Sequence, residues 1–262
     1  MRNAVRLFLT SARLSFADFS AEYSPVTFLS LAVPRYILQT LFFVLVAYAA
    51  GGSEMMKYAL IGNAVQIAAN MAQINMAITA NREKWTGTIL YLIAVPSNIL
   101  PALLGSSAAP MFQGAISTLI AFAAVIPMVG ATGLGRIWLA APIIALIVFS
   151  VSALGLLVGS ATLRTRVTVL VANALAYIMM IVCGVNFPLA ALPRWLQVAA
   201  HFLPMTNGLL AVRAVVEGSA YTDILSLISL EVLIGLVYGA LGYLVFTLQL
   251  DWARRDGKIE LF

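Results

Sequence analysis

The sequence is poor in charge and in cysteine. Only 10% of its 262 residues are charged, 62% are hydrophobic, and a single cysteine, Cys183, is present. A water-soluble domain usually carries about 25% charged residues, so this composition excludes an ordinary soluble protein. One cysteine also excludes an internal disulfide. Because roughly 20 apolar residues cross a bilayer, the chain has the length for about six spans with short loops.

The motifs of common enzymes are missing as well. No G-x-x-x-x-G-K-[ST] loop occurs, so we expect the chain to bind no ATP by itself and to hold no cofactor. One cysteine and one histidine cannot give zinc spacing, and we expect His201 to be a polar tip and Cys183 a small core residue. The net charge of +5 lies on flanks of apolar segments, which argues against a nucleic-acid partner. We predict no catalytic residue and no metal.

What the sequence does contain is a series of apolar segments, which predict an all-α integral membrane protein. The six predicted transmembrane helices cover 29–50, 58–80, 97–128, 137–161, 167–187 and 224–248. Residues 1–24 are amphipathic, with Arg2, Arg6 and Arg13 on one flank, which favours a helix lying in the membrane interface. Residues 188–223 hold two short apolar helices between prolines and glycines, a pattern typical of an interfacial or re-entrant outer cap.

Glycine and proline predict some details of this arrangement. Residues 51–57 should form a tight turn between the first two spans. Pro101 and Pro110 predict a kinked entry to the third span. G-x-x-x-G pairs at 155–159 and 235–239 should allow neighbouring helices to pack closely.

The basic residues are distributed unevenly about these spans. Of the fifteen lysines and arginines, eleven fall on the side of the two termini, and four fall on the other side: Lys57, Arg136, Arg194 and Arg213. Because cytoplasmic loops are enriched in lysine and arginine, both termini are predicted to be cytoplasmic.

The stretch 81–96, NREKWTGTILYLIAVP, is the one compact charged segment between two predicted spans. As a helix with Asn81 at its N-cap and Pro96 at its end, it carries an apolar stripe on one face. The stripe consists of Trp85, Thr88, Ile89, Leu92 and Ile93. Gly87 lets another surface come close. Composition leaves two interpretations open: a solvated loop, or a helix over 82–95 that docks on another protein.

Two sets of polar residues fall inside predicted spans. Asn63, Gln66, Asn70 and Gln73 share one face of the second span, and lipid contact there would be costly. Interhelical hydrogen bonding and substrate contact both remain open for this face. Glu231 in the sixth span is a functional hypothesis by default. We expect it to reach an outer cavity or to pair with Arg213 or Arg194, either as a structural residue or as a gate.

Two local patterns resemble a known family. One is Glu83-x-x-x-Gly87-Thr88-Ile89 followed by Pro96, similar to E-x-x-x-G-T-L…P. The other runs from Gly184-Val185-Asn186-Phe187-Pro188 through Leu192-Pro193-Arg194-Trp195-Leu196-Gln197 and Leu203-Pro204 to Arg213 and Gly218. With the predicted topology, the chain resembles the inner-membrane permease subunits of ABC-2 type transporters, the first pattern being that of the drug-resistance branch. Asn186 departs from the family, in which an apolar or aromatic residue is more usual.

The resemblance implies a six-span domain with an interface helix, a cytoplasmic coupling helix and a second transmembrane subunit, identical or similar. The coupling helix would seat on a separate nucleotide-binding ATPase subunit, which binds ATP and Mg. Family pattern assigns this role to Glu83, Gly87, Thr88 and Pro96, with Lys84 as a further rim charge. Helical spacing adds Trp85, Ile89 and Leu92 as buried anchors. The family's outer-cap motif corresponds to Pro188, Pro193, Trp195, Pro204 and Arg213.

These observations predict a non-catalytic permease subunit of an ATP-driven exporter in the bacterial inner membrane. Its substrate would be amphipathic: a drug, a lipid or a peptide. The predicted substrate path comprises Asn63, Gln66, Asn70, Gln73, Asn186 and Glu231. The alternative is an ion-coupled secondary transporter that uses Glu231 and the amide face of the second span. Such transporters usually contain internal repeats, and the sequence shows none.

Overall fold

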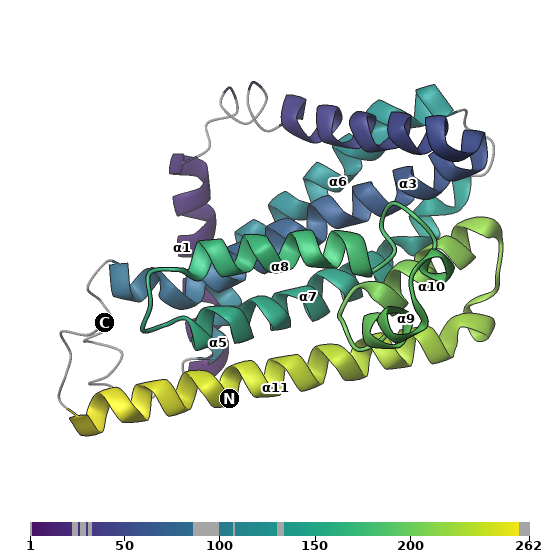
Figure 1. Ribbon diagram of the computed structural model, residues 1–262. Helices are drawn as coiled ribbons and strands as arrows, with labels where there is room; N and C mark the ends of the chain where they lie inside the picture. Colours follow the sequence, from purple (N-terminus) through teal and green to yellow (C-terminus); the bar gives the residue numbers. More distant parts are fainter. Residues whose placement is uncertain are drawn as a thin grey trace.

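The computed structural model describes residues 2–22, 26, 30, 33–85, 100–106, 108–129 and 134–256. All regular structure in this part of the chain is helical, which confirms the all-α prediction for it. The elements are α1 (Arg2–Glu22), α3 (Val33–Trp85), α5 (Leu100–Ser106), α6 (Ala108–Val129), η2 (Leu134–Ala140), α7 (Ala141–Ala161), α8 (Thr168–Val182), η3 (Leu189–Ala191), α9 (Arg194–Ala200), α10 (Thr206–Glu217), η4 (Tyr221–Ile224) and α11 (Leu225–Asp256). We call residues 188–224, from η3 to η4, the cap. The long helices lie side by side, α1 crosses them near one end, and the cap lies at the other end (Figure 1).

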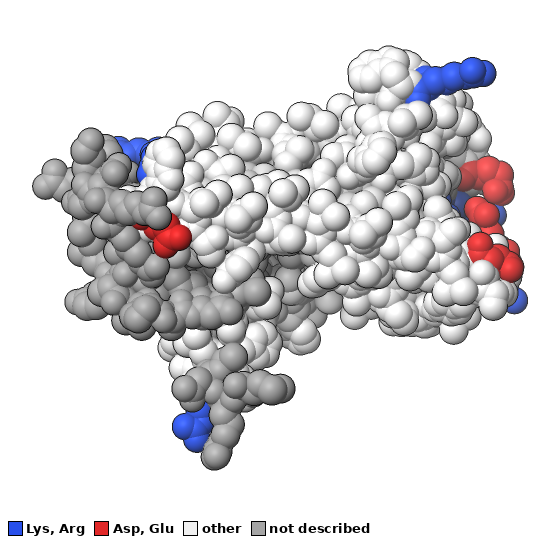
Figure 2. Space-filling model, turned by 90° about the horizontal axis from the view of Figure 1, so that it is seen from below, with Lys and Arg blue, Asp and Glu red and all other residues white. Residues whose placement is uncertain are grey.

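Length and composition mark the long helices as membrane segments. Within the described residues, three stretches are long and apolar enough to cross a bilayer: Val33–Thr79, Trp138–Ala161 and Tyr221–Trp252. Helix α8 is apolar but has only 15 residues, fewer than a span usually needs. Figure 2 shows charged side chains at the two ends of one face and on a projecting piece, with a broad uncharged surface between them. This distribution suits a chain that passes through the membrane several times.

Helix α3 is a helical hairpin. Its helical geometry breaks at Gly51 and Gly52, and Gly52 has φ 69° and ψ −156°. The chain reverses there, so that the two arms lie side by side (Figure 1). The Tyr36 hydroxyl on the first arm donates to the Met71 sulfur on the second, at 3.6 Å. Because glycine accepts a positive φ without strain, the reversal needs only these two residues.

The tight turn predicted over 51–57 is therefore too long. Residues 53–57 already belong to the returning arm, where Lys57 and Glu54 form an exposed ion pair one helical turn apart, at 3.2 Å. The polar residues in this segment indicate the water-exposed end of the hairpin and not the end of the helix.

In the range of the third predicted span, 97–128, the structure has two helices, α5 and α6, which agrees with the kinked entry predicted from Pro101 and Pro110. A proline has no N–H to offer the carbonyl four positions earlier, which for Pro110 is that of Ser106, and a continuous helix would bring the two into conflict. The Ser15 hydroxyl of α1 supplies the missing donor, at 2.6 Å from the Ser106 oxygen. Phe16 also meets Phe112 edge to face, with ring centroids 5.8 Å apart. The proline break thus gives α1 its attachment to the bundle.

Three other helix ends differ from the predicted span limits. Helix α7 begins at Ala141, because Pro142 favours a first-turn position and η2 precedes it. Helix α8 ends at Val182, not at 187, because Gly184 turns the chain with φ 70°. Helix α11 continues to Asp256, beyond 248, because charge marks the end of an apolar span but does not stop a helix.

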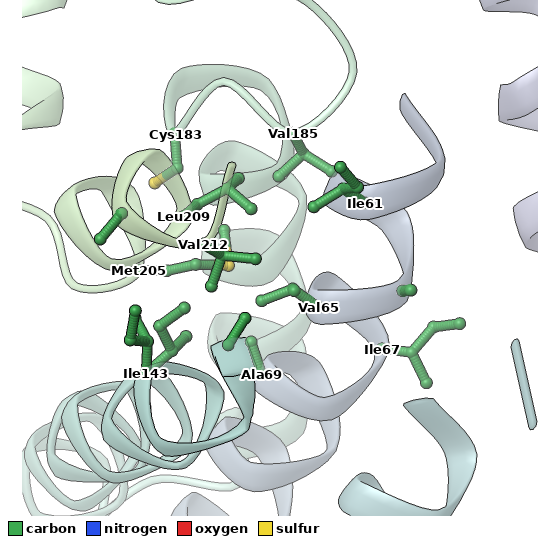
Figure 3. Packing of buried hydrophobic residues seen from close by; sticks show 14 of the residues in the cluster. Ile61, Val65, Ile67, Ala69, Ile143, Cys183, Val185, Met205, Leu209 and Val212 are labelled. Carbon is green, nitrogen blue, oxygen red and sulfur yellow. The ribbon is translucent and has the colours of Figure 1, made fainter. Parts of the chain in front are cut away.

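The cap packs on the same core as the long helices. Ile61 and Val65 of α3, Ile143 of α7, and Leu209 and Val212 of α10 belong to one buried cluster (Figure 3). Helix α10 covers 206–217 and is the second of the two short helices predicted for the cap, and Gly218 closes it with φ 112°. The cap is therefore a continuation of the hydrophobic core and not a separate domain.

Glycines bring the long helices into close contact. A Cβ atom on Gly155 of α7 would lie 2.4 Å from the Gln73 carbonyl oxygen of α3, and one on Gly235 of α11 would lie 3.0 Å from Ser150 Cβ. These contacts confirm the predicted close packing at Gly155 and Gly235, whereas Gly239 has only an ordinary contact, 3.7 Å from Ala153.

Candidate functional site

The predicted amide face of the second span lies between α3 and α8. Gln66 Nε2 donates to the Ala176 carbonyl oxygen at 3.3 Å, and Gln73 Nε2 donates to the Ala172 carbonyl oxygen at 3.2 Å. Both glutamines are buried. The face therefore contacts another helix, as the cost of exposing amides to lipid requires, and its N–H groups fasten α8 to α3.

Asn63 extends this seam to the loop that follows α8. Its Nδ2 donates to Asn186 Oδ1 at 2.6 Å and to the Ala59 carbonyl oxygen at 2.8 Å. Asn186, the residue that departs from the family pattern, is thus the partner of a predicted path residue. The structure brings together Asn63 and Asn186, and Gln66 and Gln73 lie along the same seam.

The amide oxygens on this face are hydrogen-bonded less completely than the amide N–H groups. Asn63 Oδ1, Gln66 Oε1 and Asn70 Oδ1 are buried and have no hydrogen-bond partner within the described residues. An unpaired buried acceptor costs about 1–3 kcal/mol, so a row of three is a considerable deficit. The seam therefore has spare acceptors that a molecule with N–H or O–H groups could use.

Glu231 does not behave as predicted. Its carboxylate is fully buried and accepts hydrogen bonds from the Ser150 hydroxyl, from the Met205 backbone N–H at 2.7 Å and from the Gly208 backbone N–H at 3.0 Å. The expected pairing with Arg213 or Arg194, or exposure to an outer cavity, is wrong. The reason is that the first turn of α10 presents backbone N–H groups, and these satisfy the carboxylate without a cation.

These contacts bear on the ion-coupled alternative, which needs Glu231 to exchange protons with a wet path. Two of the described partners are backbone N–H groups, which can only donate, and the third is the Ser150 hydroxyl, which also lies 3.1 Å from the Ile147 carbonyl oxygen within α7. This arrangement fixes the carboxyl group within the protein, and it gives no specific support to a proton relay.

Arg213 on α10 binds two other parts of the chain. Its Nη2 donates to the Tyr58 carbonyl oxygen at 3.2 Å and to the Val185 carbonyl oxygen at 3.0 Å, and its guanidinium lies 3.3 Å from the centre of the Tyr58 ring. Burial lowers the pKa of the Arg213 guanidinium to about 10, so it remains charged at neutral pH. Arg213 therefore joins the cap to α3 and to the loop after α8.

The other residues of the cap motif are mostly structural. Pro188 precedes η3 and Pro193 precedes α9, positions where a fixed φ suits the start of a helix. The Pro204 carbonyl accepts a weak bond from the buried Cys183 thiol, with sulfur and oxygen 3.9 Å apart. Trp195 is 70% exposed, so it lies on the outside of the cap.

The predicted coupling segment is described only at its start. Asn81 as an N-cap is wrong: α3 continues to Trp85, and the buried Asn81 amide donates to the Gly159 carbonyl oxygen of α7 at 2.8 Å. A polar residue at the end of an apolar run can join two helices as well as start one. Outside the described residues lie the side chains of Glu83, Lys84 and Trp85 and all of Gly87, Thr88, Ile89, Leu92 and Pro96.

Sequence reasoning missed Ser150 and Tyr58, which complete the environments of Glu231 and Arg213. Ser150 is a polar residue in a strongly apolar helix, and this contrast is visible in the sequence. Tyr58 contributes a backbone oxygen and a ring face, and neither contact leaves a trace in the sequence.

A separate, mostly apolar hollow of about 320 Å³ is lined by α7 and α11 and also by Met76 of α3, Leu104 of α5 and Met111 of α6. It is near the lower end of the range of about 300–1,000 Å³ that is usual for ligand pockets. Its described lining residues include Phe149, Ala153, Leu236 and Ala240. None of the predicted path residues lines it. Within the described residues no group of three His, Cys, Asp or Glu side chains could hold a metal.

Most of the chain is similar to a known protein family. Residues 24–216 match the family described as ABC-2 type transporter. The matched range includes the amide face of α3, the seam with α8, and the cap as far as α10. No curated protein gave a match.

Proposed function

The chain belongs to the ABC-2 type transporter family, and from this premise we propose that it is the permease subunit of an ATP-driven exporter. The match covers most of the chain, and the three long apolar stretches suit a multi-pass membrane domain. The sequence has no P-loop, so the proposal assigns ATP and Mg to a separate nucleotide-binding subunit. A second transmembrane subunit, a copy of this chain or a similar one, completes the path.

The observation that carries the proposal is the polar seam between α3 and α8. In a largely apolar chain, two amide N–H groups hold α8 to α3, and three amide oxygens beside them have no partner among the described residues. A seam that is closed by few bonds and keeps acceptors unused suits two helices that separate. When they separate, the oxygens of Asn63, Gln66 and Asn70 become available to a passing molecule.

The proposed substrate is amphipathic: a drug, a lipid or a peptide. Its donor groups would use the amide oxygens, and its apolar part would contact the aliphatic side chains around them. The drug-resistance branch is favoured by the E-x-x-x-G-T pattern at Glu83. Both termini are assigned to the cytoplasm of a bacterial cell, because the four basic residues Lys57, Arg136, Arg194 and Arg213 fall on the other side.

Energy would enter through residues 82–95, which we assign to contact with the ATPase subunit. Glu83 and Lys84 would form rim charges, Trp85, Ile89 and Leu92 would be buried anchors, and Thr88 and Pro96 complete the motif. Since a conformational equilibrium shifts only through differential binding energy, this segment must bind the ATPase differently in its two nucleotide states.

The test is to co-purify the chain with the ATPase encoded beside its gene and to measure ATP-driven export in vesicles. Gly87→Trp blocks the close approach and Glu83→Lys reverses a rim charge, so each should abolish export without removing the permease from the membrane. Glu54→Lys reverses an exposed charge in the hairpin of α3 and serves as the matched control. Wild-type export with Gly87→Trp and Glu83→Lys, or export without any ATPase, would contradict the proposal.

A further inference from the structure

Three elements meet at the Glu231 carboxylate. One oxygen, Oε1, accepts from the Ser150 hydroxyl of α7 and from the Met205 N–H, and the other, Oε2, accepts from the Gly208 N–H of α10. Glu231 itself belongs to α11. A single buried side chain therefore connects the start of α10 with two of the long helices.

The backbone at this point is strained. Met205 precedes α10 with φ 82°, a left-handed value that a non-glycine residue adopts only at a cost. Such a conformation persists when its surroundings hold it in place. The Met205 N–H donates to Glu231, and so does the Gly208 N–H. Gly208 lies in the first turn of α10, where backbone N–H groups have no acceptor within the helix. The carboxylate thus stabilises both the strained residue and the positive end of the helix.

The first turn of α10 is also pressed against α7. A Cβ atom on Gly208 would lie 2.3 Å from Ile147 Cγ1 and 3.4 Å from Glu231 Cδ. A side chain at this position would therefore push α10 away from the carboxylate. Only a residue without Cβ allows the contact.

The network continues from α10 to α9. Asn207 Oδ1 lies 2.7 Å from His201 Nδ1, and Asn207 Nδ2 donates to the His201 carbonyl oxygen at 3.0 Å. His201 directly follows α9. Fixing the first turn of α10 therefore fixes both helices of the cap.

We propose that Glu231 is a positioning residue that fastens the cap to α7 and α11, so that the cap follows these two helices and closes the path at its end of the protein. The contacts stand by themselves, and their consequence for the path rests on the proposed export function. Glu231 acts through the backbone of Met205 and Gly208 and does not touch the substrate.

The fastening is tested by hydrogen–deuterium exchange of the full-length chain in detergent, with Glu231→Gln compared with Glu217→Gln. The first substitution keeps the side chain's size but replaces one acceptor oxygen by an NH2 group that faces a donor. Amides of residues 205–209 should exchange about tenfold faster, as expected for the loss of one buried hydrogen bond, while those of α3 stay unchanged. Glu217 is exposed at the other end of α10, and its substitution should change neither region.

A second pair of variants tests the same contact without changing charge. Gly208→Ala places a methyl group against Ile147 and should also speed exchange at 205–209, although alanine favours helix formation. Gly239→Ala adds the same methyl group where the nearest atom is 3.7 Å away, and exchange should remain as in the wild type. If Glu231→Gln does not fold, Ser150→Ala removes one donor and should give a smaller acceleration at the same amides.

The role in closure is tested by passive leak from phospholipid vesicles loaded with calcein, without ATP. Folded protein that carries Glu231→Gln or Gly208→Ala should release the dye several-fold faster than the wild type, Glu217→Gln and Gly239→Ala. Unchanged exchange at 205–209, or faster exchange throughout the chain, would overturn the fastening. Faster exchange at 205–209 with unchanged leak would overturn its role in closure. Neither the exchange nor the leak measurement needs an ATPase. A negative result in either can therefore be distinguished from a failure of the export proposal.

Discussion

Two polar regions lie inside the same apolar bundle: the Glu231 carboxylate and the amide seam between α3 and α8. They differ in how many of their acceptor oxygens have a hydrogen-bond donor. At the cap, the two oxygens of Glu231 accept from three donors, one on α7 and two at the start of α10. Along the seam between α3 and α8, each glutamine gives one N–H to α8, and the neighbouring oxygens of Asn63, Gln66 and Asn70 have no described partner. A satisfied network resists change, whereas an unsatisfied one gains by meeting new donors. The comparison assigns rigidity to the cap attachment and movement to the seam.

The largest effect should come from removing the satisfied carboxylate. Glu231→Leu leaves the Met205 and Gly208 N–H groups buried without an acceptor, and the Ser150 hydroxyl keeps only the Ile147 carbonyl oxygen, at 3.1 Å. We expect the free energy of unfolding to fall by about 3–5 kcal/mol, measured by denaturant titration in detergent. Glu217→Leu, at an exposed position on α10, should change it by no more than about 0.5 kcal/mol. Equal effects of the two substitutions would break the comparison, because Glu231 would then have no special structural role.

Arg213 should give the next effect. Arg213→Met keeps much of the side chain's volume but leaves the Tyr58 and Val185 carbonyl oxygens without their donor and removes the contact with the Tyr58 ring. We expect a loss of about 2–3 kcal/mol in the free energy of unfolding. Arg194→Met, which removes an exposed arginine at the start of α9, is the control. A loss below about 0.5 kcal/mol for Arg213→Met would show that the cap does not depend on this contact.

A substitution in the seam should have the smallest effect on stability. Its effect on transport should be larger than its effect on stability. Gln66→Met removes one bond to Ala176, but it also removes an unpaired buried oxygen, so stability should change by about 0–1 kcal/mol. Export of an amphipathic cation such as ethidium should nevertheless fall, measured as efflux from cells that also contain the ATPase. Asn75→Met removes an amide from another face of α3 and should leave efflux unchanged. A large loss of stability with normal efflux for Gln66→Met would reverse the assignments of seam and cap.

Much of the chain's organisation could be predicted from apolar runs and from the prolines and glycines that interrupt them. The range of α10 followed from Pro204 and Gly218, and the hairpin of α3 followed from its paired glycines, because these residues act on their own backbone. The amide face was recognised from helical spacing and polarity alone.

Contacts between distant segments could not be predicted in the same way. The partners of Glu231 include two backbone N–H groups, and every residue except proline carries one, so the sequence offers no signal to choose them. Pairing with Arg213 was expected from opposite charge, yet Arg213 is occupied by two carbonyl groups and a ring. Asn81 suits an N-cap by residue type, but the backbone continues as helix and its amide reaches Gly159. In each case a backbone group, invisible in residue identity, decided the outcome.

The buried thiol of Cys183 has a practical consequence for measuring these movements. Its exposed fraction is 1%, and its sulfur faces inward toward Pro204. A bulky water-borne maleimide should therefore ignore it and react only with a cysteine introduced on the surface, for example in place of Trp195. Spin labels or fluorophores could then report distances between two copies of the chain without first engineering away the native cysteine.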